Sequence, residues 1–378
     1  SILLISSIFP QFGINTSIIK FVSESKNDFG RLKKIIIKAI FIVTILSIIS
    51  IIIIYLFNNI SIFVKYGINF SFYLIISLLP FVIINILPEV FRSLNKIKSF
   101  ILYKYTLLPI FGGFFLVITN YSITPITSYI LSIYTIFILV LIHSAYFIFF
   151  KKNISRINNE YNYSYKNILK TSYPMLLSGS SLILMGWIDS FMIGIMSNNI
   201  SDLGIYNIAV RISTIGTMIL FSINSIAAPK ISELYIDDKF KELNLIISNA
   251  TKLIFLFTMP LLIILVLMPK FLLGLFGENF SDGYIVLRIL CIGQFFNAFC
   301  GSVGYIMQLT GNEKKFQHIV MMALFVNMLL NLLLIPYYGI NGAAISSTIS
   351  LMLWNFLSMI YIKKNLKIST YFKIINEN

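Results

Sequence analysis

The sequence predicts an all-α integral membrane protein with about eleven transmembrane helices. Hydrophobic residues make up 58% of the 378 residues, and charged residues only 11%. A soluble globular domain carries about 25% charged residues, which it needs to cover its surface. Apolar runs close to the roughly 20 residues that span a bilayer recur along the whole chain. Basic residues gather in the short connections between these runs, as they do in multi-pass membrane proteins.

The apolar runs define the expected spanning segments, whose boundaries carry an error of a few residues. They cover about 1–22, 35–57, 70–94, 99–120, 124–150, 168–197, 203–230, 246–275, 284–310, 315–336 and 339–362.

The basic residues predict the orientation of these segments. Of the 29 lysines and arginines, 25 lie in alternate connections, and only Lys65 and Lys270 lie in the others. The positive-inside rule places the basic connections in the cytoplasm. The first segment must then run from outside to inside. We therefore expect a twelve-helix design in which the first helix is missing from this chain, which opens with Ser1.

Several functional classes are disfavoured by the composition and the motifs. The net charge of +15 suggests nucleic acid in a soluble protein, but here the positive-inside pattern accounts for it. Cys291 and Cys300 share one apolar segment and point to opposite sides of a helix, so we expect no disulfide. His143 and His318 have no metal-ligand neighbours in the sequence. Nucleotide, zinc and paired catalytic carboxylate motifs are not found, so we expect a protein that is not an enzyme and needs no cofactor.

An internal repeat predicts two similar bundles. Gly13-Ile14-Asn15-Thr16-Ser17 resembles Ser222-Ile223-Asn224-Ser225-Ile226 without gaps, and a Ser-Glu pair follows each stretch. Both copies have the same orientation, which indicates a parallel repeat of the kind that flanks a central cavity in transporters. We expect two pseudo-symmetric six-helix bundles. The first covers 1–150 (helices 2–6 of the pattern), a cytoplasmic basic linker covers 151–167, and the second covers 168–378 (helices 7–12).

Two ionisable residues lie deep within apolar segments, where each charge costs roughly 2.5–3.5 kcal/mol on insertion scales. Asp189 lies about eight residues before the end of its segment, and Arg211 about eight residues after the start of the next. Antiparallel neighbours bring both to roughly 12 Å below the same surface. The two side chains are thus able to pair. The pair either pins two helices together or lines a translocation cavity.

Five further polar residues inside the segments have a structural and a functional interpretation. Arg288 lies one turn below a segment end and either snorkels to the headgroups or lines the cavity. Glu89 and Arg92, spaced i,i+3, either pair locally or form a cytoplasmic gate. Asn15 and Asn224, related by the repeat, either bridge helices by hydrogen bonds or line the cavity.

Four stretches of the sequence resemble a known transporter family. They are Gly186–Gly194, Leu203–Arg211, Gly311-Asn312 and Pro336–Ala344. Together with the order of basic connections, they are similar to the polysaccharide-repeat-unit (O-antigen or capsule type) flippases of the multidrug/oligosaccharidyl-lipid/polysaccharide exporter superfamily. The resemblance covers nearly the whole chain, but its motifs are shared across the superfamily and do not identify a substrate.

The resemblance implies a transporter of the bacterial or archaeal cytoplasmic membrane. By alternating access it would flip an undecaprenyl-diphosphate-linked oligosaccharide repeat unit for surface polysaccharide biosynthesis. Its partners would be the lipid-linked glycan, membrane lipids, and a polysaccharide polymerase or other export components. Arg211 and Arg288 would then offer positive charge to phosphate or acidic sugars. Asp189, Asn15 and Asn224 complete the expected substrate cavity.

Three rival functions remain open. A cation-coupled multidrug exporter of the same superfamily is expected to gather carboxylates in its cavity, and only Asp189 lies deep here. A lipid II flippase of cell-wall synthesis requires a similar site. A membrane-bound glycosyltransferase or polymerase needs catalytic acids or a sizeable outer loop, and the predicted outer loops reach only about a dozen residues.

Overall fold

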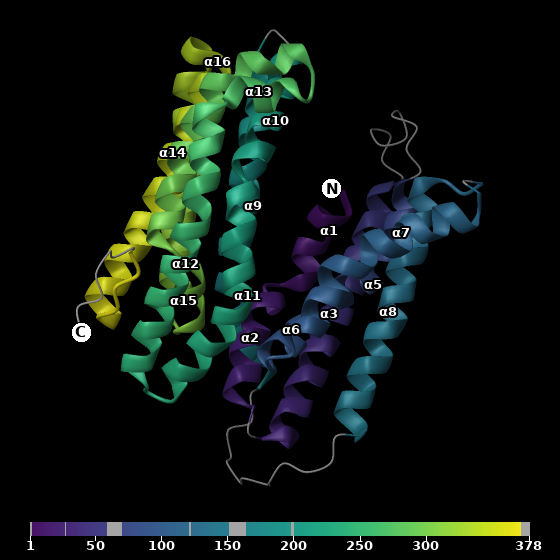
Figure 1. Ribbon diagram of the computed structural model, residues 1–378. Coiled ribbons are helices and arrows are strands. Elements are labelled where there is room, and N and C mark those ends of the chain that lie inside the picture. Colours follow the sequence, from purple (N-terminus) through teal and green to yellow (C-terminus); the bar gives the residue numbers. More distant parts are fainter. Residues whose placement is uncertain are drawn as a thin grey trace. The chain divides into compact units, whose positions relative to one another are not determined.

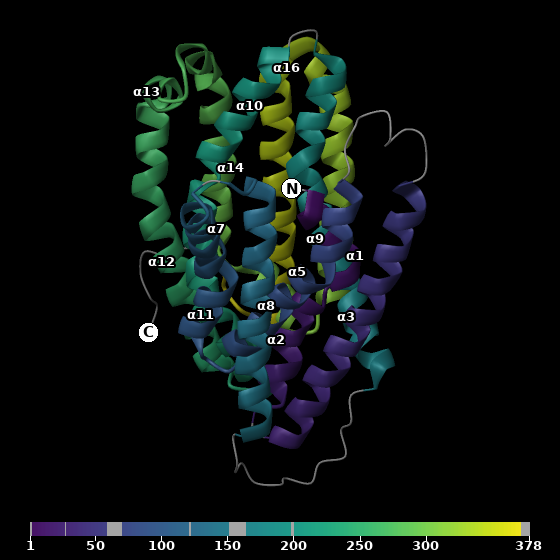
Figure 2. The same cartoon turned by 90° about the vertical axis from the view of Figure 1, so that its right-hand side faces the viewer.

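The computed structural model describes residues 2–26, 28–58, 70–120, 122–150, 164–197 and 200–371. Within these residues the secondary structure is helical, and no strand is formed. The chain divides into two compact units, Ser1–Leu176 and Leu177–Asn378, which are described here separately. In each unit most of the long helices run roughly along one direction, as expected for segments that cross a bilayer (Figure 1 and Figure 2).

Unit 1 contains the helices of the first half and the beginning of α9. They are α1 (Ile2–Gln11), α2 (Ile14–Glu24), α3 (Phe29–Asn58), α5 (Phe70–Ser93), α6 (Ile97–Ile101), the π-helix η1 (Leu102–Thr106), α7 (Leu107–Ile118), α8 (Pro125–Phe150) and α9 (Tyr165–Met196). Its apolar core joins α2, α3, α5 and α8, with Ile14, Val43, Leu78 and Ile136 almost completely buried.

Unit 2 contains the rest of α9 and the helices of the second half. They are α10 (Ile200–Ser213), α11 (Ile215–Ile236), α12 (Phe240–Leu267), α13 (Pro269–Gly274), the 3₁₀ helix η2 (Glu278–Gly283), α14 (Tyr284–Cys300), α15 (Val303–Leu309) and α16 (Glu313–Leu366). One core cluster joins α9, α10, α12, α14 and α16 through side chains such as Ile193, Ala209, Leu262 and Leu287.

The predicted fold class is confirmed. Nine of the described helical segments are long and apolar enough to cross a membrane. The count differs from the eleven predicted segments for two reasons. The first predicted segment is broken into α1 and α2, each too short to qualify alone, and α16 joins the last two predicted segments across a kink at Gly339.

The break between α1 and α2 follows from the packing of Gly13. Phe12 and Gly13 both have positive φ, 47° and 70°, which interrupts the helix. A Cβ atom on Gly13 would lie 2.4 Å from the backbone oxygen of Ser172 on α9. The hydroxyls of Ser17 and Ser172 are 2.6 Å apart at the same contact. Only glycine allows the two backbones to approach this closely.

The kink in α16 makes a helical hairpin. Gly339 adopts φ 54° and ψ −134°, so the helix reverses direction there. A Cβ atom on Gly342 would lie 2.4 Å from the backbone oxygen of Leu334 on the opposite arm. Further along the hairpin, Asn327 donates a hydrogen bond to Ser350 over 3.2 Å. The run of small residues after Pro336 therefore serves close packing of the two arms.

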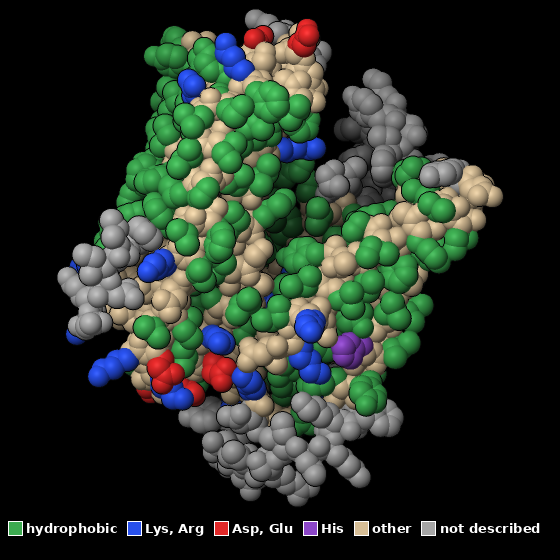
Figure 3. Space-filling view, viewed as in Figure 1, with side chains coloured by type: hydrophobic (Ala, Val, Ile, Leu, Met, Phe, Trp, Pro, Cys, Tyr) green, Lys and Arg blue, Asp and Glu red, His purple; other side chains and the backbone are tan. Residues whose placement is uncertain are grey.

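The outer surfaces of the helices are apolar. On α3, Ile37, Phe41, Ile45, Ile48 and Ile52 are each 42–53% exposed and lie three or four residues apart, on one helix face. In water such a face would be covered by another element, whereas a lipid tail solvates it without cost. Figure 3 shows hydrophobic side chains over most of the visible surface, with many charged side chains near the helix ends.

Two predicted segments end differently in the structure. The predicted segment 246–275 breaks at Met268 because Pro269 starts a new short helix, α13. The predicted segment 284–310 breaks at Gly301, whose φ is 69°, before α15 begins. Each break arises from a single glycine or proline within an apolar run, and hydropathy alone does not predict it.

The predicted domain boundary remains a prediction. Most of the predicted linker 151–167 lies outside the described residues, as does Lys65 in the predicted 58–69 connection. The two compact units divide within α9, between Leu176 and Leu177.

We predict that Gly13→Ala destabilises the protein by more than about 1 kcal/mol, because the new methyl group meets the α9 backbone at a positive φ. Thermal unfolding of the detergent-purified protein measures the change. Gly113→Ala in α7 is the control, since its added Cβ meets no atom within 4 Å. Equal unfolding temperatures for the two variants would show that the Gly13 contact is unimportant.

Candidate functional site

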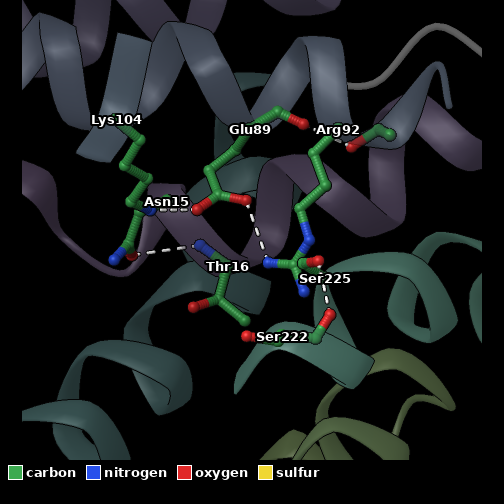
Figure 4. Close-up of polar contacts among 8 residues, drawn as sticks. Asn15, Thr16, Glu89, Arg92, Lys104, Ser222 and Ser225 are labelled. Carbon is green, nitrogen blue, oxygen red and sulfur yellow. Dashed lines mark hydrogen bonds and ion pairs between the residues drawn. The ribbon is translucent and has the colours of Figure 1, made fainter. Parts of the chain in front are cut away.

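Unit 1 contains a largely buried cluster of three charged side chains, of which Lys104 is the most exposed, at 16%. Glu89 and Arg92 lie on α5 and are only 4% and 2% exposed. Arg92 Nη1 donates a hydrogen bond to Glu89 Oε2 over 3.1 Å, and Lys104 Nζ donates to Glu89 Oε1 (Figure 4). Two cations thus share one carboxylate, and these three residues together carry one net positive charge. The i,i+3 pair was predicted from the sequence, whereas Lys104 was assigned only to a basic connection.

A π-helical turn positions Lys104. Residues Leu102–Thr106 form η1, in which hydrogen bonds span five residues, and Thr106 Oγ1 donates to the carbonyl of Ile101 over 3.2 Å. Pro109, a little further along, has no N–H to offer the carbonyl four residues before it, which favours an irregular turn. The wider turn rotates Lys104 relative to a regular helix. Single π turns of this kind occur frequently at functional sites.

Aromatic rings hold the cations of this region. The Phe100 ring is 1% exposed and lies 5.2 Å from Arg92 Cζ and 5.4 Å from Lys104 Nζ. Lys96 Nζ lies 4.1 Å from the centre of the Phe147 ring. Cation–π contacts stabilise a desolvated cation without neutralising it. The positive charge of the cluster is therefore retained.

Asn15 lies at the beginning of α2, in the same close-up as Lys104 and Glu89 (Figure 4). Its Oδ1 accepts a hydrogen bond from the backbone N–H of Thr16 over 3.0 Å. His143, on α8, stacks on Phe91 with ring centres 4.5 Å apart, and its Nδ1 lies 3.1 Å from the Tyr103 hydroxyl. No sequence motif indicated that His143 has these aromatic neighbours.

Unit 2 buries a single carboxylate in a network of neutral donors. Asp189 is 3% exposed. Its Oδ2 accepts hydrogen bonds from the hydroxyls of Tyr206, over 2.7 Å, and of Ser347. Its Oδ1 accepts from the amides of Asn331, over 2.6 Å, and of Asn327, over 3.2 Å. The donors come from α10 and from both arms of α16.

The network leaves one negative charge and one acceptor unsatisfied. Among the described residues, no lysine or arginine pairs with Asp189, and Asn331 Oδ1 is a buried oxygen with no hydrogen-bond partner. An uncompensated buried charge is costly, so the site favours a proton or a bound cation. Rotating either amide by 180° replaces a donor with an oxygen ligand. Carboxylate, amide and hydroxyl oxygens suit a small hard cation, and one negative charge suits a monovalent one.

Arg211 does not pair with Asp189. The two residues lie on neighbouring helices as predicted, but Arg211 is exposed and forms no ion pair with this carboxylate. Helical phase explains the difference. Tyr206 points its hydroxyl at Asp189, and Arg211 follows five residues later, about 140° further around α10. Asn207, next to Tyr206, accepts a hydrogen bond from Ser190 over 2.9 Å and ties α9 to α10 instead.

The remaining predicted site residues of unit 2 lie apart from Asp189. Arg288 is exposed at the beginning of α14, and its Nε donates to the carbonyl of Val266 over 3.2 Å. Asn224 is completely buried within α11. The structure therefore does not gather Arg211, Arg288 and Asp189 into one site, and their assignment to a substrate cavity stays a prediction.

A family model described as "Polysaccharide biosynthesis protein" matches residues 1–235, more than half of the chain. The chain belongs to this polysaccharide biosynthesis protein family. A second model, MatE, matches residues 174–336. The family membership predicted from the sequence motifs is confirmed, and the long apolar helices among the described residues fit a multi-pass membrane protein.

Proteins with related sequences include one named for polysaccharide biosynthesis and one named as a probable flippase. The capsular polysaccharide biosynthesis protein CapF of Staphylococcus aureus is 30% identical over 149 residues, which are 39% of this chain and 38% of CapF. The probable flippase AglR of Haloferax volcanii is 25% identical over 176 residues, which are 46% of this chain and 37% of AglR. The alignments thus span less than half the length of these relatives.

Solved transporters share the fold. A MOP superfamily transporter from Pyrococcus furiosus superposes with a TM-score of 0.78 at 14% identity, over 97% of this chain and 86% of the other. A mutant of the Vibrio cholerae MATE transporter VcmN gives a TM-score of 0.77 at 13% identity, with the same coverage. At these identities the likeness shows the fold alone.

We predict that a small monovalent cation or a proton stabilises the protein through Asp189. At ten times its dissociation constant, a bound ion adds about 1.4 kcal/mol to the free energy of unfolding. Thermal unfolding at constant ionic strength, with sodium replacing choline and at several pH values, measures the effect. Asp189→Asn should abolish the stabilisation by the ion. Asp237→Asn, which removes a half-exposed carboxylate, should preserve it. If the unfolding temperature of the Asp189→Asn variant still depends on sodium or pH as in the wild type, this carboxylate is not the ion site.

Proposed function

We propose that the protein flips a lipid-diphosphate-linked oligosaccharide across the cytoplasmic membrane, and that Arg92 and Lys104 bind the phosphates. In bacteria the carrier would be undecaprenyl diphosphate. The observation that carries this proposal is the buried cluster in unit 1, where two cations share the single carboxylate of Glu89. The family match and the glycan flippases among the relatives support the same substrate class.

The cluster suits a diphosphate because two cations converge on one carboxylate and contact one aromatic ring, which holds them in place. Arginine offers a planar fork of N–H donors that matches phosphate oxygens, and lysine adds a point charge. In the absence of substrate, Glu89 occupies both cations. A diphosphate carries more negative charge than one carboxylate, so it competes for the same donors. Glu89 thereby acts as an internal counter-ion that substrate displaces.

The rival function, a cation-coupled multidrug exporter, is favoured by the MATE structural neighbours but not by the charges. A cationic drug needs an accessible carboxylate. Glu89 is engaged by two cations, and Asp189 is enclosed by four hydrogen-bond donors. A cationic drug would therefore have to displace Arg92 and Lys104 from Glu89, or open the hydrogen-bond network around Asp189.

Asp189 supplies the proposed energy coupling. The sequence shows no nucleotide-binding motif, so active transport draws on an ion or substrate gradient. A proton or cation at Asp189 neutralises the charge to which α10 and the two arms of α16 donate hydrogen bonds. Loading and release of that ion change the strength of these bonds. Through such a hydrogen-bond network, an ion gradient can bias the equilibrium between two conformations.

We predict opposite effects of neutralising the two kinds of charge in the cluster. Arg92→Gln with Lys104→Gln weakens binding of a polyprenyl-diphosphate oligosaccharide about tenfold or more, since each lost charge-assisted bond is worth about 1.5–3 kcal/mol. Glu89→Gln tightens binding, because it removes the competing carboxylate. Binding to the purified protein and flipping in proteoliposomes measure both effects.

Two further variants keep this test decisive. Lys363→Gln with Lys364→Gln removes the same number of charges from an exposed helix end and should bind like the wild type. The triple variant Glu89→Gln, Arg92→Gln, Lys104→Gln leaves no unpaired charge in this trio and should still lose binding. Unchanged affinity in the triple variant, or transport of cationic dyes in place of the glycan lipid, would refute the proposal.

A further inference from the structure

Two cationic side chains of unit 2 meet at one aromatic ring. Lys270 Nζ lies 4.7 Å from the centre of the Tyr284 ring, and Arg288 Cζ lies 5.8 Å from the same centre. Lys270 is on α13 and Arg288 on α14, so the chain brings them together at the end of the unit where α12 stops. Lys270 is one of only two basic residues in the connections that the sequence assigns to the outer side.

The acidic side chains of the described residues leave both cations, Lys270 and Arg288, without an ion-pair partner. Arg288 uses Nε to cap the carbonyl of Val266, one of the last carbonyls of α12. This bond fixes the guanidinium group while leaving its terminal N–H donors available. The site therefore presents two positive charges with unfilled hydrogen-bonding capacity.

The two cations line a groove of about 510 Å³ whose other walls are apolar. Leu267, Met268 and Phe271 contribute to these walls and are 71%, 51% and 60% exposed. Exposed apolar side chains next to unpaired cations fit an amphiphile, in which a phosphate is joined to hydrocarbon chains. A free soluble anion would leave the apolar walls unused.

We propose that this groove binds an anionic phospholipid. The phosphate lies between Lys270 and Arg288, and the upper parts of the acyl chains lie against Leu267, Met268 and Phe271. Tyr284 holds the two cations at one ring through cation–π contacts. Basic residues at a membrane interface attract anionic headgroups in this way. The site is independent of the proposed substrate cluster, which uses Arg92 and Lys104 of unit 1.

The test compares lipids and variants by native mass spectrometry of the detergent-purified protein. Wild-type protein should retain phosphatidylglycerol in preference to phosphatidylcholine, and rising salt should weaken this retention. Lys270→Gln with Arg288→Gln should lower phosphatidylglycerol affinity about tenfold or more. Lys314→Gln with Lys315→Gln, which removes two exposed charges at the beginning of α16, is the matched control and should bind normally.

Tyr284→Leu provides a second variant that keeps both charges. It should weaken phosphatidylglycerol binding by a smaller factor than the double variant does, because the two cations remain but lose the aromatic ring that both contact. The proposal is overturned if the double variant binds phosphatidylglycerol like the wild type, or if phosphatidylcholine binds equally well. Preferential loss of polyprenyl-diphosphate binding in the double variant would instead assign the groove to transport substrate. These lipid-binding measurements are independent of the transport measurements on the Arg92 and Lys104 variants.

Discussion

The hydrocarbon core of a membrane supplies no hydrogen-bond partners, so a charged side chain buried within these helices depends on partners from the protein. Asp189 shows this constraint most clearly. Its carboxylate is enclosed by two hydroxyls and two amides from three helical segments, and no cation of the described residues pairs with it. In unit 2, α9, α10 and α16 are therefore linked through one charge, in addition to their apolar contacts. The same constraint in unit 1 joins α5 to the π turn through Glu89.

Most of the fold follows from hydropathy and charge, because a spanning helix needs only length and apolarity. The eleven predicted segments correspond to helices in the structure, in the same order. The errors concern interruptions: Gly13, Pro269 and Gly301 break apolar runs that hydropathy treats as continuous. At Gly13 the break depends on close approach to α9, more than 150 residues away in the sequence, which a local pattern cannot reveal.

The candidate sites were predicted less completely than the fold. The sequence identified Asp189, Glu89 and Arg92 because a charge inside an apolar span is conspicuous. The partners of Asp189 were missed because Tyr206, Ser347 and Asn331 are neutral, and neutral polar residues are common in this chain. Asn327 and Asn331 offered the best available signal, since two amides spaced i,i+4 in an apolar segment lie on one helix face. Pairing Asp189 with Arg211 considered the depth of the two residues in their segments but ignored the helical phase.

The hairpin of α16 has a consequence for biogenesis. Asn327 would be an unfavourable residue in a helix that entered the bilayer by itself, because its amide would lack a partner. The sharp reversal at Gly339 brings Ser350 within 3.2 Å of that amide as soon as both arms are helical. The two arms are thus suited to leave the translocon together, as one insertion unit. The tight turn between them then guides assembly during synthesis as well as packing in the finished protein.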